Sequence, residues 1–127
     1  MKYIIIPACN TNDRCKQWLD DCLESIRAGG YYQDNYQVLI CYDNCSKEFQ
    51  DYYRVKYSGD FIRGLNNQNT TNLNFAANVN TGLRVALQAS RSVEGIDDHF
   101  IILNMDTILP PSARFDQILG EGLSLSP

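Results

Sequence analysis

The sequence predicts one α/β domain with a Rossmann-like, mostly parallel β-sheet and helices on both faces of that sheet. Two observations lead to this fold class. Short apolar segments alternate along the chain with longer segments whose apolar residues recur every three or four positions. The apolar segments are also rich in Ile, Val and Tyr with little polar alternation, which is typical of strands buried on both faces of a parallel sheet.

The first half of the chain contains the clearest elements. Residues 2–7 (KYIIIP) form an apolar run closed by proline and predict a strand. Between residues 13 and 28 the apolar side chains share one helical face; Asn12 or Asp13 precedes it as a capping residue, and Gly29 follows where a helix is expected to end. Residues 36–42 (YQVLICY) predict a second strand.

The middle of the chain is less regular. Residues 47–53 predict a short helix, and residues 54–66 are expected to hold a third, more exposed strand. The tyrosines at positions 52, 53 and 57 fit either a binding surface or the packed side of an amphipathic helix. Residues 66–74 (NNQNTTNLN) are strongly polar and predict a loop.

A second long helix is expected over residues 74–92, followed by a strand over 99–103 and a short helix over 112–119. In the long helix the residues predicted to share one face are Phe75, Val79, Leu83, Ala86, Leu87 and Ser90. Gly82 lies inside this pattern, where glycine costs about 1 kcal/mol relative to alanine. We therefore expect a neighbouring element to approach closely at Gly82.

Composition narrows the function classes. The 127 residues are 44% hydrophobic and carry a net charge of −4, so the chain can bury a core and lacks the basic surface of a nucleic-acid binder. No segment approaches the roughly 20 apolar residues needed to span a bilayer, and no export signal is recognisable at the N-terminus. The expected location is cytoplasmic, and we expect no nucleic-acid partner and no transmembrane segment.

The five cysteines are expected to be reduced thiols. Their number is odd, and their spacing does not form paired C-x-x-C ligand motifs. A structural zinc site is therefore disfavoured. Cys22 and Cys41 are expected to be small buried core residues, as free cysteine often is.

Polar residues follow three of the predicted strands, at the edge where α/β proteins bind ligands. Asn10 follows the first strand. Asp43 ends the second strand and could accept a hydrogen bond from a base or a ribose, although an Asx-turn is the alternative. Asp106 follows Asn104 after the last strand, and its carboxylate suits Mg²⁺ or Mn²⁺; the alternative is a turn cap before Pro110.

Five segments of the chain form a series of motifs: residues 5–10 (IIPACN), 22–26 (CLESI), 38–46 (VLICYDNCS), 72–82 (NLNFAANVNTG) and 102–107 (ILNMDT). In this order they resemble motifs of family 2 glycosyltransferases of the GT-A fold, especially rhamnosyltransferase-like members. The last segment is similar to L-N-P-D-T, a variant of the metal-binding Asp-x-Asp motif. The resemblance implies a nucleotide-sugar-binding GT-A-like domain over residues 1–111, and residues 112–127 are expected to form a short helix and a tail.

The resemblance also implies roles for residues at the rim of the sheet. Pro7 and Asn10 would line the nucleotide pocket, and Asp43 would contact the base or the ribose. Asn72 and Asn80 would shape the pocket wall near the donor. For residues 72–82, the alternative is a capped helix with solvated asparagines; a helix N-terminus there could also face an anion.

Asn104 and Asp106 would hold the donor diphosphate, with Asp106 on the Mg²⁺ or Mn²⁺ ion. The implied reaction is inverting transfer of a sugar from a nucleotide-sugar donor to a hydroxyl of an acceptor, which could be a saccharide, a lipid-linked glycan or a protein. The sequence departs from the family pattern: Cys9 stands where many members carry Tyr, and Asn104 replaces the first Asp of Asp-x-Asp.

The catalytic base is not assigned. Family members continue into an acceptor-binding half that carries this residue, whereas here about twenty residues follow Asp106, which predicts a truncated GT-A fold. The alternative function is a non-catalytic nucleotide- or nucleotide-sugar-binding domain, or a degenerate interaction domain. A shortened parallel sheet leaves an exposed edge, so we also expect the chain to form homo-oligomers.

Overall fold

The structure is a computed structural model that describes residues 2–10, 12–67, 75–90 and 99–111. Strands and helices alternate along the described chain. The elements are β1 (Lys2–Cys9), α1 (Arg14–Ala28), β2 (Tyr36–Asp43), α2 (Lys47–Lys56), β3 (Ile62–Asn67), α3 (Phe75–Ser90) and β4 (His99–Ile102). The helix expected over 112–119 and the tail after it lie outside the described residues.

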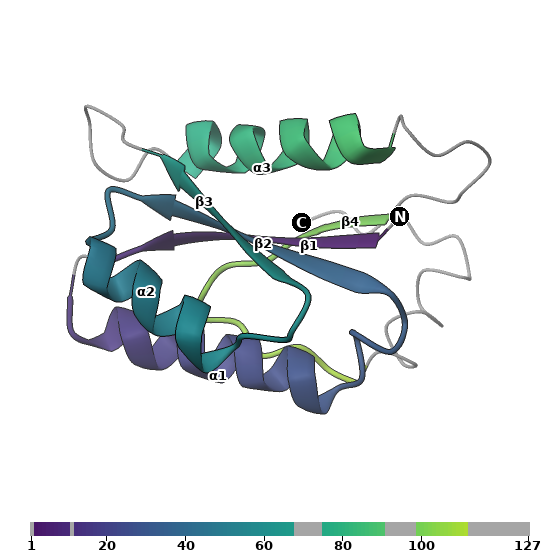
Figure 1. Cartoon of the computed structure of the whole chain (residues 1–127), viewed down its shortest axis with the longest axis horizontal. Helices are drawn as coiled ribbons and strands as arrows, with labels where there is room; N and C mark the ends of the chain where they lie inside the picture. Colours follow the sequence, from purple (N-terminus) through teal and green to yellow (C-terminus); the bar gives the residue numbers. More distant parts are fainter. Residues whose placement is uncertain (1, 11, 68–74, 91–98, 112–127) are drawn as a thin grey trace.

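The four described strands form one sheet in the order β3-β2-β1-β4. Every strand pair in it is parallel. Helices α1 and α2 cover one face of the sheet, and α3 covers the other (Figure 1). The predicted α/β class, the parallel sheet and the helices on both faces are therefore confirmed, and the arrangement is consistent with a Rossmann-like fold.

Strand alternation sends side chains from the central strands into two separate apolar layers. The layer beneath α1 and α2 receives Ile4, Ile6, Ala8, Val38, Ile40 and Tyr42. The layer beneath α3 receives Tyr3, Ile5, Leu39 and Cys41. Because β1 and β2 are buried on both sides, the runs that encode them are nearly continuous in apolar residues, as the sequence pattern predicted.

Helix α1 begins and ends close to the predicted positions. Five apolar side chains on one face of this amphipathic helix are fully buried, those of Cys15, Leu19, Cys22, Leu23 and Ile26, whereas Trp18 is half-buried. The Asn12 side chain accepts a hydrogen bond from the backbone N–H of Arg14 at 2.8 Å, whereas Asp13 makes no side-chain capping bond. Gly29 caps the C-terminus, and Gly30 follows with a φ of 81°. This left-handed conformation is accessible to glycine without strain.

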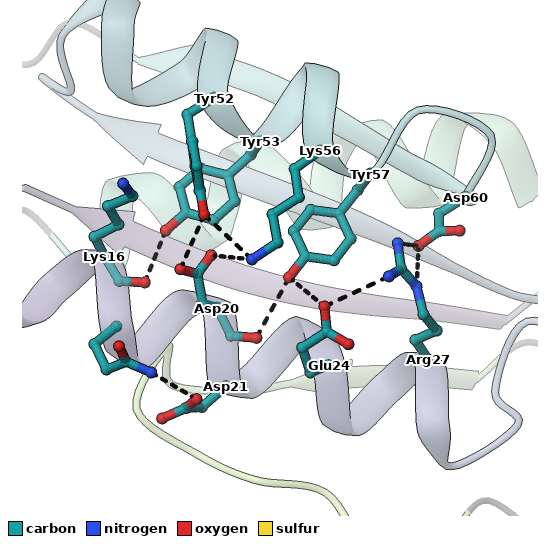
Figure 2. Close-up of polar contacts among 11 residues, drawn as sticks. Lys16, Asp20, Asp21, Glu24, Arg27, Tyr52, Tyr53, Lys56, Tyr57 and Asp60 are labelled. Atoms are coloured by element: carbon teal, nitrogen blue, oxygen red, sulfur yellow. Dashed lines mark hydrogen bonds and ion pairs between the residues drawn. The ribbon is translucent and has the colours of Figure 1, made fainter.

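Helix α2 continues past the predicted residue 53 because its tyrosines pack against α1 (Figure 2). The Tyr53 hydroxyl donates to the backbone carbonyl of Lys16 at 2.9 Å, and the Tyr57 hydroxyl donates to the Glu24 carboxylate at 3.0 Å. The two rings stack with centroids 6.2 Å apart. The extra turn therefore follows from tertiary contacts that helix periodicity does not report.

The inward side of α3 matches the prediction at Val79 and Ala86, which are buried, but not at Leu87. Leu87 is 45% exposed, whereas Asn78, Gly82 and Ala86 are buried against the sheet. A Cβ atom at Gly82 would lie 2.7 Å from Ile5 Cγ2 and 2.8 Å from the Cys41 sulfur, so the close approach expected at this glycine is confirmed. Because Gly82 and Ala86 are small, α3 lies close to the sheet, and the half-buried Leu83 packs beside this contact.

Other boundaries change little. Strand β3 ends at Asn67, so its last two residues fall in the segment expected to be a loop, and its described side chains are exposed or half-buried, as expected. Among the described helices, none is long and apolar enough to cross a membrane.

Candidate functional site

The three segments that follow β1, β2 and β4 and carry the predicted polar site residues meet at the carboxyl edge of the sheet. Strands β1 and β2 end at the same level, because Cys9 is the register partner of Asp43. Strand β4 stops earlier, with Ile102 opposite Ile5. The chain then turns back so that the backbone N–H of Cys9 donates to the Met105 sulfur at 3.5 Å. The expected convergence of these segments is therefore observed in the backbone.

The early end of β4 also explains how β1 accommodates Pro7. Proline has no N–H, so it is disfavoured in the middle of a sheet. The carbonyl of Ile5 accepts the last β4-side bond, from the N–H of Leu103 at 2.9 Å. Pro7 lies two residues further along β1, so its nitrogen is directed toward the side where β4 has already ended. The half-buried Pro7 is thus compatible with a central strand and lies close to the rim.

Asp43 is the most buried polar residue of the predicted site, with a side chain only 5% exposed. It follows Cys41 by two residues and so belongs to the α3 side of β2. The loop after it is tightly held: Asn44 has a φ of 53°, and the Cys45 thiol donates weakly to the Ala8 carbonyl at 3.7 Å. The backbone that follows Asp43 is therefore tied to the end of β1.

Asn78 lies within the predicted motif segment, residues 72–82, but the sequence did not assign it a role in the donor pocket. Its side-chain Nδ2 donates to the backbone carbonyl of Cys41 at 2.9 Å, and the residue is 2% exposed. This bond ties the first turns of α3 to the end of β2, next to Asp43. A signal was present, because Asn78 lies one helical turn before Gly82 and therefore on the same side of the helix.

Of the other asparagines expected along the donor pocket, Asn10 and Asn80 are among the described residues. Asn80 is exposed on α3, so its amide is available to a ligand. Asn72 lies outside the described residues. Asn10 is exposed directly after β1 and lines a cleft of about 310 Å³ between the first turns of α1 and α2. The other residues lining this cleft are Asn12, Asp13, Lys16, Ser46, Glu48, Phe49 and Tyr52.

Asn104 and Asp106 lie in a turn closed by a hydrogen bond from the Thr107 N–H to the Asn104 carbonyl at 3.0 Å. Both side chains are exposed. After the turn the chain runs along α1, where the backbone N–H of Leu109 donates to the Ser25 hydroxyl at 3.1 Å. The predicted metal ligand therefore belongs to the segment on the α1 side of the sheet.

The electrostatics agree with this position of Asp106. Burial raises the pKa of the Cys22 thiol in α1 to about 12, and the negative charge of Asp106 adds to that increase. Asp43, by contrast, belongs to the α3 side of β2. The structure thus brings the backbones of the rim segments together while assigning their two carboxylates to opposite sides of the sheet.

Within the described ranges, no group of three or more His, Cys, Asp or Glu side chains is arranged to hold a metal ion. Mg²⁺ commonly needs only one or two protein carboxylates when a diphosphate and water supply the remaining oxygens. Asp106 and Asn104 are exposed two residues apart in the same turn, so an ion held mainly by a diphosphate would take its protein ligands from this turn.

The cysteines fit the expectation of structural thiols. All five are free, and only Cys9 is more than marginally exposed. Cys22 and Cys41 are completely buried, as predicted. Burial also raises the pKa of Cys45 to about 12, so this thiol stays protonated near neutral pH and is a poor nucleophile.

Comparison of the chain with known proteins gives no match to a family model, a curated protein or a solved structure. The family hypothesis therefore depends on the residues and on their positions in the fold. Those positions are the shared edge of β1 and β2, the turn after β4, and the α3 side of the rim where Asp43 lies.

Proposed function

We propose that this chain binds a nucleoside-diphosphate sugar at the carboxyl edge of its sheet, as the donor-binding part of a metal-dependent inverting glycosyltransferase. One observation carries the proposal: three segments far apart in sequence, each chosen for its polar residues, meet at that edge. Ligands of open α/β sheets bind outside the carboxyl ends of the strands. The motif resemblance adds the ligand class to this location.

In the proposed complex, Asp43 accepts a hydrogen bond from an N–H of the base or from a ribose hydroxyl. Its burial supports this role, because a charge-assisted hydrogen bond gains strength when water is excluded. Pro7 contributes an apolar surface on the neighbouring strand, and Asn10 contributes an exposed amide after β1. Asn72 and Asn80 would complete the wall of the pocket.

The diphosphate would lie near the turn after β4, where Asp106 would ligate Mg²⁺ or Mn²⁺ and Asn104 would contact phosphate oxygens. A bound divalent ion would neutralise charge that develops on the leaving diphosphate. The contribution of this chain would be one carboxylate and one amide, from Asp106 and Asn104, which lie two residues apart in a closed turn. The acceptor and the general base remain unassigned.

Donor binding is testable by thermal unfolding with UDP, dTDP and GDP, each with Mn²⁺ and then with EDTA. A ligand at 100 times its dissociation constant stabilises a protein by roughly 2.7 kcal/mol, which is several degrees for a domain of this size. We expect one nucleotide to raise the Tm in a metal-dependent manner.

Three variants locate the binding site. Asp106→Ala should abolish the metal dependence of the shift, and Asp43→Asn should reduce the shift with or without metal. Asp21→Ala removes an exposed carboxylate on α1 that pairs only with Gln17 within the described contacts, and should leave the shift unchanged. If no nucleotide raises the Tm, or if Asp21→Ala acts like Asp106→Ala, the donor-site proposal is wrong.

A non-catalytic binding domain would give the same shifts. Transfer is then tested by incubating the chain with the nucleotide sugar and a panel of acceptor hydroxyl compounds, and measuring release of the nucleoside diphosphate. Release that depends on both the acceptor and Asp106 supports an enzyme. Binding without release supports the binding-domain alternative.

A further inference from the structure

We propose that a second site, the groove between α2 and β3, binds an uncharged saccharide. The groove has a volume of about 420 Å³, within the range of about 300–1,000 Å³ found for small-molecule sites. It lies along the outer edge of the domain, between α2 and the edge strand (Figure 1). The residues lining it are Tyr42, Gln50, Asp51, Tyr53, Arg54, Tyr57, Ser58, Gly59, Asp60, Ile62 and Gly64.

The floor of the groove is apolar and rigid. Three tyrosines contribute to it, and each is held by packing: Tyr42 meets Phe49 edge-on, while Tyr53 and Tyr57 stack on each other. Gly64 of β3 lies directly against the Tyr42 ring, since a Cβ atom at this position would come within 2.8 Å of Tyr42 Cε2. Glycine therefore allows the Tyr42 ring to lie directly against the backbone of β3.

The charges along the groove are compensated. Asp51 pairs with Arg54 at 2.9 Å, and Asp60 pairs with Arg27 of α1 at 2.9 Å, the latter pair being visible in Figure 2. A strongly anionic ligand would meet two carboxylates, and a cationic ligand would have to compete with two arginines. An uncharged ligand avoids both costs.

The rim nevertheless offers directional hydrogen bonds. The side-chain amide nitrogen of Gln50, Nε2, donates to the Cys45 carbonyl at 3.1 Å and to Asn66 Oδ1 at 3.2 Å. These two bonds fix the orientation of the Gln50 amide. The guanidinium of Arg54 and the hydroxyl of Ser58 are exposed. Fixed acceptors and donors around an apolar floor suit a pyranose, which combines an apolar C–H face with a ring of hydroxyls.

This site is separate from the proposed donor site. Tyr42 belongs to the α1–α2 side of β2, whereas the next residue, Asp43, belongs to the α3 side. The inference therefore does not depend on nucleotide binding. A variant that weakens the donor site, Asp43→Asn, should leave saccharide binding unchanged.

The test is titration of the isotope-labelled chain with methyl glycosides of glucose, galactose, mannose, rhamnose and N-acetylglucosamine, observed in amide spectra. We expect at least one of them to shift the amide signals of Tyr42, Arg54 and Gly64 in a saturable manner at millimolar concentration. Absence of saturable shifts for every glycoside, or shifts confined to other parts of the chain, would overturn the proposal.

Two variants separate binding from folding. Ser58→Trp places a bulky side chain at an exposed position of the groove and should weaken binding at least tenfold while the spectrum outside the groove stays unchanged. Lys47→Ala, an exposed change on α2 outside the groove, should have no effect. Equal binding by Ser58→Trp and the unmodified chain would locate the saccharide elsewhere and refute the assignment.

Discussion

Most aromatic rings of the described core lie on the side of the sheet beneath α1 and α2, whereas α3 contacts the other side through the small residues Gly82 and Ala86. On the first side, Phe49, Tyr53 and Tyr57 fill the space between two helices and the sheet. On the second, Gly82 and Ala86 let one helix lie directly against Ile5 and Cys41. The same sheet therefore uses bulk on one side and close approach on the other.

The two sides of the sheet therefore contribute differently, one mainly to stability and the other to the rim of the candidate site. Large rings bury much apolar surface, and their hydroxyls find partners on α1, so this side supplies much of the stability. Close approach buries less surface but brings the first turns of α3, through Asn78, to the end of β2 beside Asp43. The α3 side therefore serves mainly to shape the rim of the candidate site.

The largest expected effect comes from removing a ring on the aromatic side. Tyr53 is 1% exposed and has ring contacts with Phe49 and Tyr57 at 5.1 and 6.2 Å between centroids. Tyr53→Ala should lower the free energy of unfolding by about 3–5 kcal/mol, the usual cost of deleting a buried aromatic side chain. Urea unfolding measures the change.

Tyr53→Phe is the matched control. It keeps the ring and removes only the hydroxyl that donates to the Lys16 carbonyl, so about 1 kcal/mol should be lost. Equal losses for the two variants would mean that the hydroxyl, not the ring, stabilises this side.

The next largest effect is expected from filling the close approach on the α3 side. Gly82→Leu introduces a side chain whose Cβ alone would overlap Ile5 and Cys41, and leucine retains high helix propensity. Overpacking of this kind should cost about 1–3 kcal/mol. In addition, α3 must move away from β2, so the nucleotide-dependent rise in Tm should be lost.

Leu87→Ala provides the contrast on the same helix. Leu87 is 45% exposed, so this change should alter the free energy of unfolding by less than about 0.5 kcal/mol. A large loss in Leu87→Ala together with a tolerated Gly82→Leu would mean that α3 packs by the leucine-lined side that its sequence pattern favours.

A smaller effect should appear at alkaline pH and compare the two sides directly. Burial raises the pKa of Cys22 on the α1 side from 9.0 to about 12, and that of Cys41 on the α3 side from 9.0 to about 11. Below pH 9 these thiols are protonated in both states. Above it they ionise first in the unfolded chain, so the free energy of unfolding falls by about 1.4 kcal/mol per pH unit for each thiol.

Urea unfolding from pH 8 upward measures this slope. Cys22→Ala and Cys41→Ala should each flatten it, although both substitutions also leave small cavities that lower stability at neutral pH. The contribution of Cys41 should end near pH 11, while that of Cys22 continues toward pH 12. A free energy of unfolding that does not change between pH 9 and 10 would show that the thiols are not protected by burial.

Local sequence patterns were enough to locate every described element. Apolar runs identified β1, β2 and β4, and helical periodicity identified α1 and α3. The glycine at position 82 predicted the close contact between α3 and the sheet. The positions of Asn10, Asp43 and Asp106 after their strands followed from the same reasoning, because a parallel sheet gathers the carboxyl ends of its strands at one edge.

Other features required the folded chain. Helical periodicity predicted that Leu87 faces the sheet. In the structure Asn78 and Gly82 of α3 face it instead, because small side chains allow a shorter distance between the helix and the sheet. The partner of Asn78, the carbonyl of Cys41, is 37 residues away in the chain. No local pattern encodes a contact of that kind.

The sequence by itself determined the order of strands and helices, the parallel sheet, and the polar residues that follow the strands. Tertiary structure decided the side of the sheet to which each carboxylate belongs, with Asp43 toward α3 and Asp106 toward α1, and it created the groove between α2 and β3. The physical reason is one of range. Periodicity and turn propensity act over a few residues, whereas packing depends on side chains that meet only after the chain has folded.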